Sequence, residues 1–275
     1  MPELPEAEVA RRLLAVATDR ERLRGVVHVD PRLLRRMDAP GADDAFGEAL
    51  RGRRVIATSR HGKHLVAELE GGVHWWLHLG MSGRLALRDT PGGQHARLVV
   101  QVGRSFLVLD DPRRFAATAA GTAKAVHGWA GLGALGPDAL ALTEDADAFA
   151  DALRGRARLK AALLDQRRLA GVGNIQAAEA CHRAGLDPAR RLDALSEGEL
   201  DALRRGLRES LEHTLAATLP KSVGDEIAYL SDGAHVANPF LVYGRAGDPC
   251  GRCGAAITTR KEGGRTTYLC AGCQR

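Results

Sequence analysis

Four of the five cysteines in this 275-residue chain lie within its last 26 residues. They form two pairs, CGRC at 250–253 and CAGC at 270–273, with the overall spacing C-x2-C-x16-C-x2-C. Each pair can place two thiolates on one metal ion, and the two pairs together complete the tetrahedral sulfur site that suits zinc. The pattern therefore predicts one structural Zn2+ ion bound by Cys250, Cys253, Cys270 and Cys273. An iron–sulfur or redox-active cysteine site is the alternative.

The segment between the two cysteine pairs, GAAITTRKEGGRTTYL, has the pattern of a β-hairpin. An element this small cannot bury enough apolar surface to fold by itself, so we expect the metal to provide its stability. Because four cysteine ligands leave no open coordination position, the metal is expected to be structural and not catalytic. The remaining cysteine, Cys181, lies apart in a helical pattern and is expected to be a buried free thiol.

The rest of the chain is long enough for two or three domains, and its hydrophobic periodicity changes along its length. A helical pattern with proline in its first turn covers residues 5–17. Short β-like runs separated by turns follow, at residues 24–30, 53–60, 63–70, 73–80, 84–89, 96–102 and 105–111. Such runs predict an antiparallel sandwich or barrel. Helical patterns come next, at residues 144–155, 158–165, 174–185 and 196–219.

The last of these helical patterns has the strongest signals. It begins with a capping box, Ser196 with Glu199, and its apolar face carries leucines at positions 200, 203, 207, 211 and 215. Residues 132–140 have the composition of a linker, and the polar segment 220–240 is predicted to be a long loop. The sequence therefore predicts an α+β multi-domain chain, with a helix and a β domain first, a helical domain next and a metal-bound hairpin last.

Composition excludes some classes of protein and permits others. No apolar run approaches the roughly 18 residues of a membrane span. The start of the chain lacks the basic segment and apolar run of a secretory signal, so we expect a cytoplasmic protein with no membrane partner. The formal net charge of +5 permits an anionic partner such as nucleic acid without requiring one.

Several separated motifs occur together in one order along the chain. They are MPELPE at 1–6, RHGKHLV at 60–66, HLGMSGRL at 78–85, DDPRRF at 110–115, LLDQRRLAGVGNIQAAEACHRAGLDP at 163–188 and VYGRAGDPC at 242–250. With the cysteine pairs, this set resembles the bacterial formamidopyrimidine-DNA glycosylase/endonuclease VIII family over essentially the whole chain. The resemblance implies a bacterial, nucleoid-associated monomer that acts on double-stranded DNA containing oxidised bases or abasic sites.

The resemblance also implies a domain organisation. It predicts an N-terminal catalytic β-sandwich domain at 1–130, a helix–two-turn–helix DNA-binding domain at 141–235 and a zinc finger at 241–275. In that family the two lobes flank a DNA groove, and the enzymes excise oxidised bases and then cut the strand. We therefore expect Pro2, Glu3, Lys63, Asn174 and Arg265 to line one groove, although they span the full sequence.

The first residues have a chemical use in this resemblance. Removal of Met1 would leave Pro2 with a free secondary amine, and an α-amino group has a pKa of about 8, so part of it is neutral and nucleophilic. Attack on C1′ of the damaged nucleotide would give a cationic iminium, which promotes phosphate elimination on both sides of the sugar. Glu3 would carry a proton to the sugar ring oxygen. Another use of an N-terminal proline, as the general base of small tautomerases, does not fit the length or the cysteines.

Other residues match positions that hold DNA in the family. Lys63 matches a lysine that contacts a phosphate and assists elimination, and Arg265 matches an arginine that grips a phosphate and aids the second elimination. Asn174, at the turn into a helix, matches a phosphate contact, and His78 and Lys160 match positions near the DNA backbone. Without the motifs, these side chains would be interpreted as solvated charges or a helix cap.

A second group matches the residues that fill the space left by an everted base. Met81, Arg113 and Phe115 match an apolar wedge and an arginine that bonds the orphaned base, with Arg114 directed toward a phosphate. His95 stands where the family usually has two histidines. This set resembles the formamidopyrimidine branch and predicts excision of 8-oxoguanine and formamidopyrimidines followed by β,δ-elimination.

The chain departs from the family pattern at a few positions. Gln176 replaces a tyrosine, Ala116 replaces a glycine, and the segment 229–245 differs from the usual loop that covers 8-oxoguanine. These changes leave a second hypothesis open, namely a specialised or catalytically impaired relative that binds damaged or abasic DNA. A generic zinc-ribbon DNA-binding protein is a third, but it does not explain MPELPE or Lys63.

Overall fold

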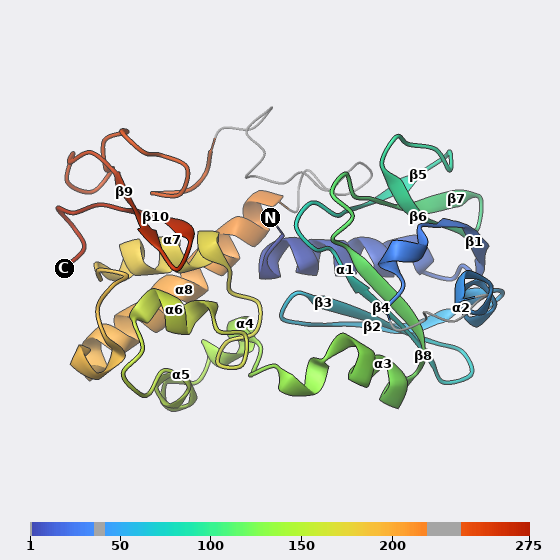
Figure 1. Cartoon of the computed structure of the whole chain (residues 1–275), viewed down its shortest axis with the longest axis horizontal. Helices are drawn as coiled ribbons and strands as arrows, with labels where there is room; N and C mark the ends of the chain where they lie inside the picture. The colour runs from blue at the N-terminus through green and yellow to red at the C-terminus, as the bar shows by residue number, and fades with distance from the viewer. Residues whose placement is uncertain (1, 36–41, 219–237) are drawn as a thin grey trace. The chain divides into compact units, whose positions relative to one another are not determined.

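The computed structural model describes residues 2–35, 42–218 and 238–275. The chain separates into two compact units (Figure 1), one covering the described residues up to Ala134 and the other those from Leu135 to Ala217 and from 238 to Arg275. The loop predicted at 220–240, with much of the segment 229–245, lies outside the described residues. No described helix is both long and apolar enough to cross a membrane.

The first unit contains a helix and two antiparallel four-stranded sheets among its described residues, with strand orders β1-β6-β7-β5 and β2-β3-β4-β8. The strands are β1 (Leu23–Val29), β2 (Val55–His61), β3 (His64–Leu69), β4 (Val73–His78), β5 (Arg84–Arg88), β6 (Ala96–Val102), β7 (Ser105–Asp110) and β8 (Ala117–Thr122). Helix α1 (Leu4–Thr18) packs against β2 of one sheet and β5 of the other. The predicted N-terminal helix and β-sandwich are confirmed.

Buried side chains alternate with more exposed ones along β3, which contributes to the core of this unit. On β3, the side chains of Leu65, Ala67 and Leu69 are fully buried, at the two-residue period expected of a strand with one face in a core. Strand β8 was not predicted, because its sequence ATAAGT contains few residues that favour strands. It pairs with β4, where the indole nitrogen of Trp75 donates to Oγ1 of Thr118 over 3.0 Å. Two further helices of this unit, α2 (Ala42–Leu50) and α3 (Ala123–Ala130), were also not predicted.

The second unit is helical and ends in a hairpin. Its helices are α4 (Ala139–Leu142), α5 (Ala146–Ala152), α6 (Leu159–Leu164), α7 (Asn174–Ala184) and α8 (Glu197–Thr218), and its strands are β9 (Thr258–Glu262) and β10 (Arg265–Leu269). Short 3-10 turns in the chain are η1 (Pro31–Leu33), η2 (Leu132–Ala134) and η3 (Leu192–Ala194). The predicted helices and hairpin are all present, with bounds that differ by a few residues.

Helix α8 packs against α7 through apolar and polar contacts. Leucines 203, 207 and 211 of the predicted stripe are buried, whereas the terminal leucines of the stripe are only partly buried. Gln176 of α7 is also buried, and its amide donates to Oγ1 of Thr214 (2.9 Å) and accepts from Oγ of Ser210 (2.7 Å). The departure from the family pattern at Gln176 therefore places a buried amide where both of its polar atoms are satisfied.

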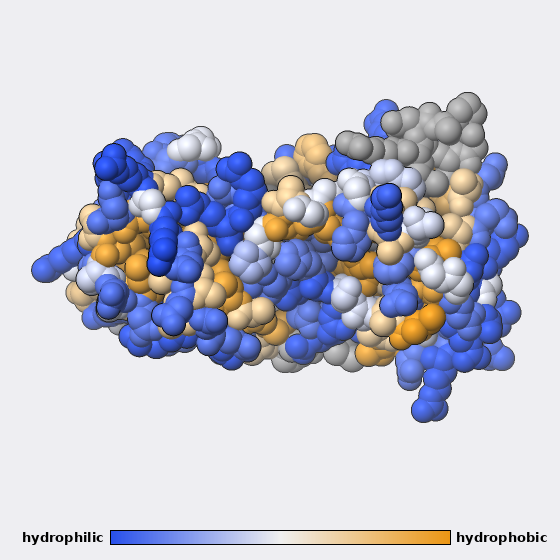
Figure 2. All heavy atoms as spheres, turned by 90° about the horizontal axis from the view of Figure 1, so that it is seen from below, coloured by the Kyte–Doolittle hydropathy of each residue, from blue (hydrophilic) through white to orange (hydrophobic). Residues whose placement is uncertain are grey.

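Hydrophilic residues predominate on the face shown in Figure 2, with hydrophobic residues interspersed. Over the described part of the chain, the strongly exposed large hydrophobic residues are Val16, Val27, Ile56, Met81 and Phe115. The first three lie on a helix or strand, but Met81 lies on a turn and Phe115 on a loop. A large apolar side chain held in water on a turn or loop has no packing role, so these two are candidates for binding.

Candidate functional site

The start of α1 holds the first residues of the chain in place. Glu3 is the N-cap of α1, and its backbone N–H donates to Oε2 of Glu6 over 2.8 Å, while its own side chain accepts from the backbone of Glu6. Both carboxyls are buried, and burial together with the charge of Glu3 raises the pKa of Glu6 to about 7. This reciprocal capping box fixes the buried residue Pro2 directly before the helix.

Helix α1 is tied to the strand that leads to Lys63. Glu8 of α1 pairs with Arg11 and Arg12 of the same helix and with Arg60 of β2, whose Nε lies 3.3 Å from Oε2. Burial alone would raise the pKa of Glu8, but the hydrogen bonds from Arg11 and Arg12 and nearby positive charge outweigh it and lower the pKa to about 2. Lys63 follows in the two-residue turn between β2 and β3 and is half-buried.

Next to Lys63, two histidines each stack on the ring of Trp76. The ring centroids of His64 and His78 lie 4.8 Å apart. The indole N–H of Trp76 donates to Nδ1 of His64 (3.1 Å), and the backbone N–H of Gly80 donates to Nδ1 of His78 (3.1 Å). Each Nδ1 is thus an acceptor, so the ring proton of each neutral histidine lies on Nε2. Burial, and then the charge of Lys63, lower the pKa of His78 to about 4, so at neutral pH it is an uncharged N–H donor.

Met81, Arg113 and Phe115 lie on two loops in contact. Met81 is 40% exposed on the turn after β4, and Phe115 is 48% exposed between β7 and β8. The guanidinium carbon of Arg113 lies 4.9 Å from the centre of the Phe115 ring. A Cβ atom on Gly80 would lie 2.3 Å from the backbone of Phe115, so only glycine permits this approach. The structure therefore places the three side chains of the predicted wedge on adjoining loops.

Asp111 holds both loops and was missed by the sequence analysis. Its fully buried carboxylate accepts hydrogen bonds from the hydroxyl of Ser82 and from the backbone N–H groups of Arg113 (3.2 Å) and Ala116 (2.6 Å). It therefore fixes the turn that carries Met81 and the loop that carries the Arg–Phe pair. An aspartate directly before proline is a general turn signal, and it could have marked Asp111 for attention.

Two other predicted residues lie in the same unit. Arg114 adopts the left-handed conformation, with φ of 57°, and its Nε lies 3.2 Å from Oδ2 of Asp30. His95 is half-buried in the turn before β6, and its Nδ1 has no hydrogen-bond partner among the described residues. A non-glycine residue at positive φ stores strain, so the surrounding loop must impose this conformation on Arg114.

In the second unit, the predicted residues Lys160, Asn174 and Arg265 gather around the hairpin. Asn174 is the first residue of α7, and its Nδ2 donates to the carbonyl of Thr266 over 2.9 Å. Lys160 of α6 is only 3% exposed, and its Nζ lies 2.6 Å from Oγ1 of Thr267. Arg265 itself is exposed at the start of β10.

Lys160 and Arg265 border a basic cavity. A cavity of about 620 Å³ lies between α6 and the hairpin, and Arg158, Lys160, Lys261 and Arg265 line it together with Glu262. Its excess of positive charge suits an anionic group such as a phosphate.

The hairpin also carries the four cysteines predicted to bind metal. Their Sγ atoms all lie within 4.8 Å of one another. The Sγ–Sγ distances are 3.8 Å for Cys250 and Cys273 and 3.5 Å for Cys253 and Cys270. Four sulfurs at about 2.3 Å from one zinc ion would be about 3.8 Å apart, so the set fits a tetrahedral zinc site. Cys181 is fully buried in α7, where burial raises the pKa of its thiol to about 12.

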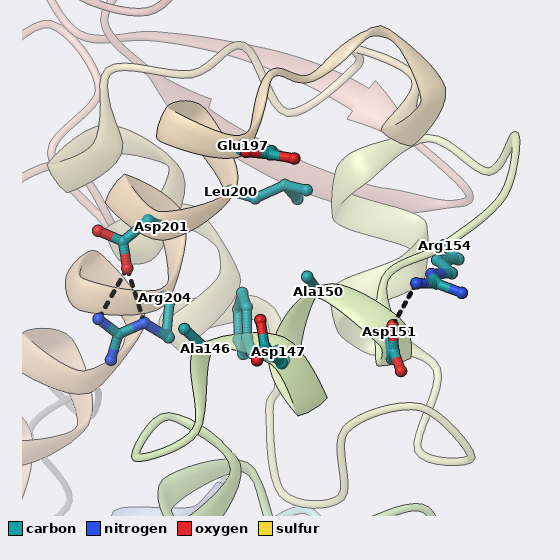
Figure 3. A pocket seen from close by; sticks show the side chains of 10 residues that line it. Ala146, Asp147, Ala150, Asp151, Arg154, Glu197, Leu200, Asp201 and Arg204 are labelled. Carbon is teal, nitrogen blue, oxygen red and sulfur yellow. Dashed lines mark hydrogen bonds and ion pairs between the residues drawn. The ribbon is translucent and has the colours of Figure 1, made fainter.

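A different cavity lies between α5 and the start of α8 and has a volume of about 540 Å³ (Figure 3). Its rim is acidic, and two of its aspartates pair with arginines, Asp151 with Arg154 and Asp201 with Arg204. No site residue predicted from the sequence is among the described residues that line it. A third aspartate, Asp147, lies in the first turn of α5, where its negative charge stabilises the helix. Since these three aspartates already have roles within the protein, we assign no ligand to this cavity.

The predicted residues thus fall into two groups, one in each compact unit. The first consists of Pro2 and Glu3 just before the first turn of α1, Lys63 and His78 in the sheet of β2, β3, β4 and β8, and the wedge loops. The second contains the residues around the zinc hairpin. A single groove that combines both groups stays a prediction.

Three family models match successive parts of this chain. Residues 1–118 match the family described as formamidopyrimidine-DNA glycosylase N-terminal domain. Residues 135–222 match the formamidopyrimidine-DNA glycosylase H2TH domain, and residues 247–275 match the zinc finger found in FPG and IleRS. The four cysteines therefore form the site of one structural zinc ion.

Two relatives that align with the full length of this chain are both formamidopyrimidine-DNA glycosylases. A formamidopyrimidine-DNA glycosylase of Thermus thermophilus is 39% identical over 277 residues, covering 100% of this chain and 98% of the relative. That of Azorhizobium caulinodans is 36% identical over 306 residues, covering 100% of both.

Solved structures show the same fold. The crystal structure of the MutM (Fpg) protein from Thermus thermophilus has a TM-score of 0.80 at 35% identity, covering 99% of this chain and 98% of that one. A complex of Lactococcus lactis Fpg with DNA containing Fapy-dG has a TM-score of 0.84 at 27% identity, covering 99% and 100%. With its domains matched in order and relatives aligned over its full length, the chain belongs to the formamidopyrimidine-DNA glycosylase family.

Proposed function

We propose that this protein excises oxidised purines, among them 8-oxoguanine and formamidopyrimidines, from double-stranded DNA and then cuts the strand at the resulting abasic site. It is a base excision repair glycosylase with lyase activity by family. Two of these substrates, formamidopyrimidines and abasic sites, are supported by the Lactococcus lactis relative, which has been solved with DNA containing Fapy-dG and with DNA containing an abasic site. The capping box that holds Pro2 and Glu3 in a fixed position is the observation that carries the proposal for this chain.

The first step would use Pro2 after removal of Met1. The neutral secondary amine forms a bond to C1′, and the glycosidic bond breaks with its electron pair leaving on the base. The amine nitrogen loses its proton, which Glu3 carries to the ring oxygen as the C1′–O4′ bond opens, and this leaves an iminium between Pro2 and C1′. The rigid cap matters here because a flexible N-terminus would have to be ordered before each attack.

Strand cleavage would follow from the iminium. Loss of a C2′ proton expels the 3′ phosphate, and loss of a C4′ proton then expels the 5′ phosphate. Hydrolysis of the iminium returns the free amine. Lys63 and Arg265 would neutralise the departing phosphates, with the uncharged His78 and with Asn174 holding the DNA backbone.

The wedge would occupy the space of the everted base. Exposed Met81 and Phe115 replace lost stacking, and Arg113 bonds the unpaired partner base. Arg114 and His95 would support the backbone beside it. We further propose the domain division 1–130, 141–235 and 241–275, action as a monomer, and a location in the bacterial cytoplasm at the nucleoid.

A substrate panel tests this function. Purified protein is incubated with duplexes that carry 8-oxoguanine, a formamidopyrimidine, an oxidised pyrimidine or an abasic site, with and without borohydride. We expect cleavage of the first two and of the abasic duplex, and a covalent protein–DNA adduct in borohydride. A variant with an uncleavable residue added before Pro2 should bind DNA and form no adduct, because it lacks the amine.

Two outcomes would revise the proposal. An adduct that survives the added residue would make a lysine the nucleophile, with Lys63 the first to test. Binding without any cleavage by the correctly processed protein would support the alternative, a specialised or impaired relative, which full-length similarity to named glycosylases does not favour.

A further inference from the structure

We propose that Lys160 is a positioning residue that holds Arg265 through Thr267 and Glu262, and that it does not bind a DNA phosphate. This inference rests on the proposed function, because Arg265 is the residue whose task it would serve. It assigns Lys160 a role different from the DNA contact expected from sequence.

The ammonium of Lys160 is enclosed. The side chain is 3% exposed and Thr267 is fully buried, and Nζ of Lys160 lies 2.6 Å from Oγ1 of Thr267. Although Lys160 lines the basic cavity, its ammonium is occupied by the hairpin. Burial also lowers the pKa of Lys160, an effect that the nearby charge of Glu262 opposes.

The hydrogen bonds run in one direction. Oγ1 of Thr267 donates to Oε2 of Glu262 over 2.9 Å. An ammonium can only donate and a carboxylate can only accept, so the hydroxyl of Thr267 must accept from Lys160 and donate to Glu262. No rearrangement of protons offers an alternative, and each of the three side chains fixes the next.

Glu262 is in turn the cross-strand neighbour of Arg265. The two residues pair in the hairpin register and are separated only by Gly263 and Gly264, whose φ values of 54° and 75° suit a tight two-residue turn. The position of the Glu262 side chain therefore fixes the end of β9, and through the turn the start of β10 where Arg265 stands.

The charges in this network balance one another. Arg260 donates from Nε to Oε1 of Glu262 (2.6 Å) and from Nη1 to Oδ2 of Asp187 (3.0 Å). The two cations, Lys160 and Arg260, are thus matched by Glu262 and Asp187. The positive charge of Lys160 is used inside the protein, whereas that of exposed Arg265 is available to a ligand.

The backbone beside Arg265 is held from the helical side as well. The carbonyl of Thr266 accepts from Nδ2 of Asn174 at 2.9 Å, and Nζ of Lys160 lies 3.5 Å from the same carbonyl. Both residues that follow Arg265 are therefore bound by α6 or α7. Loss of this support should affect the step that depends on Arg265, the second elimination, more than attack by Pro2.

The test uses the zinc-loaded full chain and isosteric variants. Thr267→Val removes the hydroxyl, Thr267→Ser keeps it as the matched control, and Lys160→Met removes the ammonium. On a duplex with an abasic site, the ratio of δ- to β-elimination product is measured, and binding is measured as a function of salt. We expect Thr267→Val and Lys160→Met each to lower the product ratio by about three- to tenfold, with the double variant no worse than either. Thr267→Ser should match the wild type.

The salt dependence separates positioning from phosphate binding. Arg265→Ala should reduce the slope of log K against log salt by about 0.9, the value for one lost phosphate contact. Lys160→Met and Thr267→Val should leave the slope unchanged. A reduced slope in Lys160→Met with wild-type behaviour in Thr267→Val would overturn the inference and make Lys160 a phosphate ligand. Additive effects in the double variant would also overturn it, because they would show that Lys160 and Thr267 act independently.

Two controls keep the test decisive. Zinc content is measured for each variant, and if Lys160→Met loses zinc, the comparison of Thr267→Val with Thr267→Ser still decides the outcome, because neither changes charge. If the wild-type protein makes no cut, the proposed function fails by itself, and the salt slopes still test whether Lys160 touches DNA.

Discussion

Nε2 of His182 lies 3.4 Å from Sγ of Cys250, so the last turn of α7 reaches the zinc ligands. His182 is 3% exposed, and the carbonyls of His182 and Arg183 each accept from the guanidinium of Arg252 at 3.2 Å. The zinc finger is thereby attached to the helical unit at its metal end. An N–H donor to a zinc thiolate is the kind of outer contact that tunes metal affinity.

Replacement of this histidine should loosen zinc. In His182→Phe the ring volume is retained and the hydrogen bond to Cys250 is lost, so we expect zinc affinity to fall by about tenfold. Competition with a chromogenic chelator measures it. His127→Phe, at an exposed histidine of α3, is the control and should retain zinc as the wild type does. Equal zinc loss in both variants would contradict a specific contact.

Asp111→Asn should destabilise the loops of the wedge. The variant keeps the shape of the side chain, but its NH2 group would face backbone N–H donors that now bond to the carboxylate. We expect the free energy of unfolding in urea to fall by roughly 1–3 kcal/mol. Asp89→Asn, at an exposed aspartate, should change it by less than about 0.5 kcal/mol. Similar values for the two variants would show that the clamp has little energetic weight.

Phe115→Ala should separate stability from DNA binding. Because the ring is 48% exposed, its loss should change the free energy of unfolding by no more than about 0.5 kcal/mol. Binding to a lesion duplex should weaken by roughly tenfold, as measured by fluorescence anisotropy, because the wedge no longer replaces the lost stacking. Ile56→Ala, at a residue 62% exposed on β2, is the matched control and should bind normally. Unchanged binding by Phe115→Ala would remove this residue from the wedge.

Glu8 should make stability depend on acid pH. Its folded-state pKa of about 2 lies below the ordinary 4.5, so the unfolded chain binds more protons between these values. The stabilisation is therefore complete above about pH 4.5 and is lost as the pH falls toward 2. Glu8→Gln should lower the free energy of unfolding by roughly 2–4 kcal/mol at neutral pH, since it removes the carboxylate charge that pairs with Arg11, Arg12 and the largely buried Arg60.

Urea unfolding at neutral and acid pH measures this dependence. The difference between Glu8→Gln and the wild type should shrink as the pH approaches 2. Glu48→Gln, at an exposed ion pair with Arg51, is the control and should have a small effect at every pH. A difference that stays constant with pH would mean that Glu8 acts through packing and not through its charge.

The fold was predictable where residues repeat with a clear period. Leu65, Ala67 and Leu69 alternate as a strand must, and the leucines of α8 follow the helical period, so local sequence alone identifies these elements. Strand β8 could not be found this way, because its alanines favour no strand and become one only by pairing with β4. Tertiary contact decides such segments, and a single sequence does not contain that information in local form.

Within the candidate site, the sequence identified the metal ligands but not the contacts that support the other side chains. The cysteines converge as their spacing requires, since two knuckles can satisfy one metal ion. By contrast, nothing near Asp111 in the sequence indicates that it bonds to Ser82, and nothing near Lys160 indicates Thr267. Both contacts join segments far apart in the chain, and each converts a residue with an ordinary expected role into a support for another.

The hydrogen bonds of Gln176 also bear on how this sequence can change with descent. Its amide is shared between Ser210 and Thr214, so replacing any one of the three alone would remove a buried hydrogen bond between α7 and α8. Lineages should therefore exchange these positions jointly. A tyrosine at 176 should accompany different residues at 210 and 214, and the three columns of a family alignment should covary as one inherited unit.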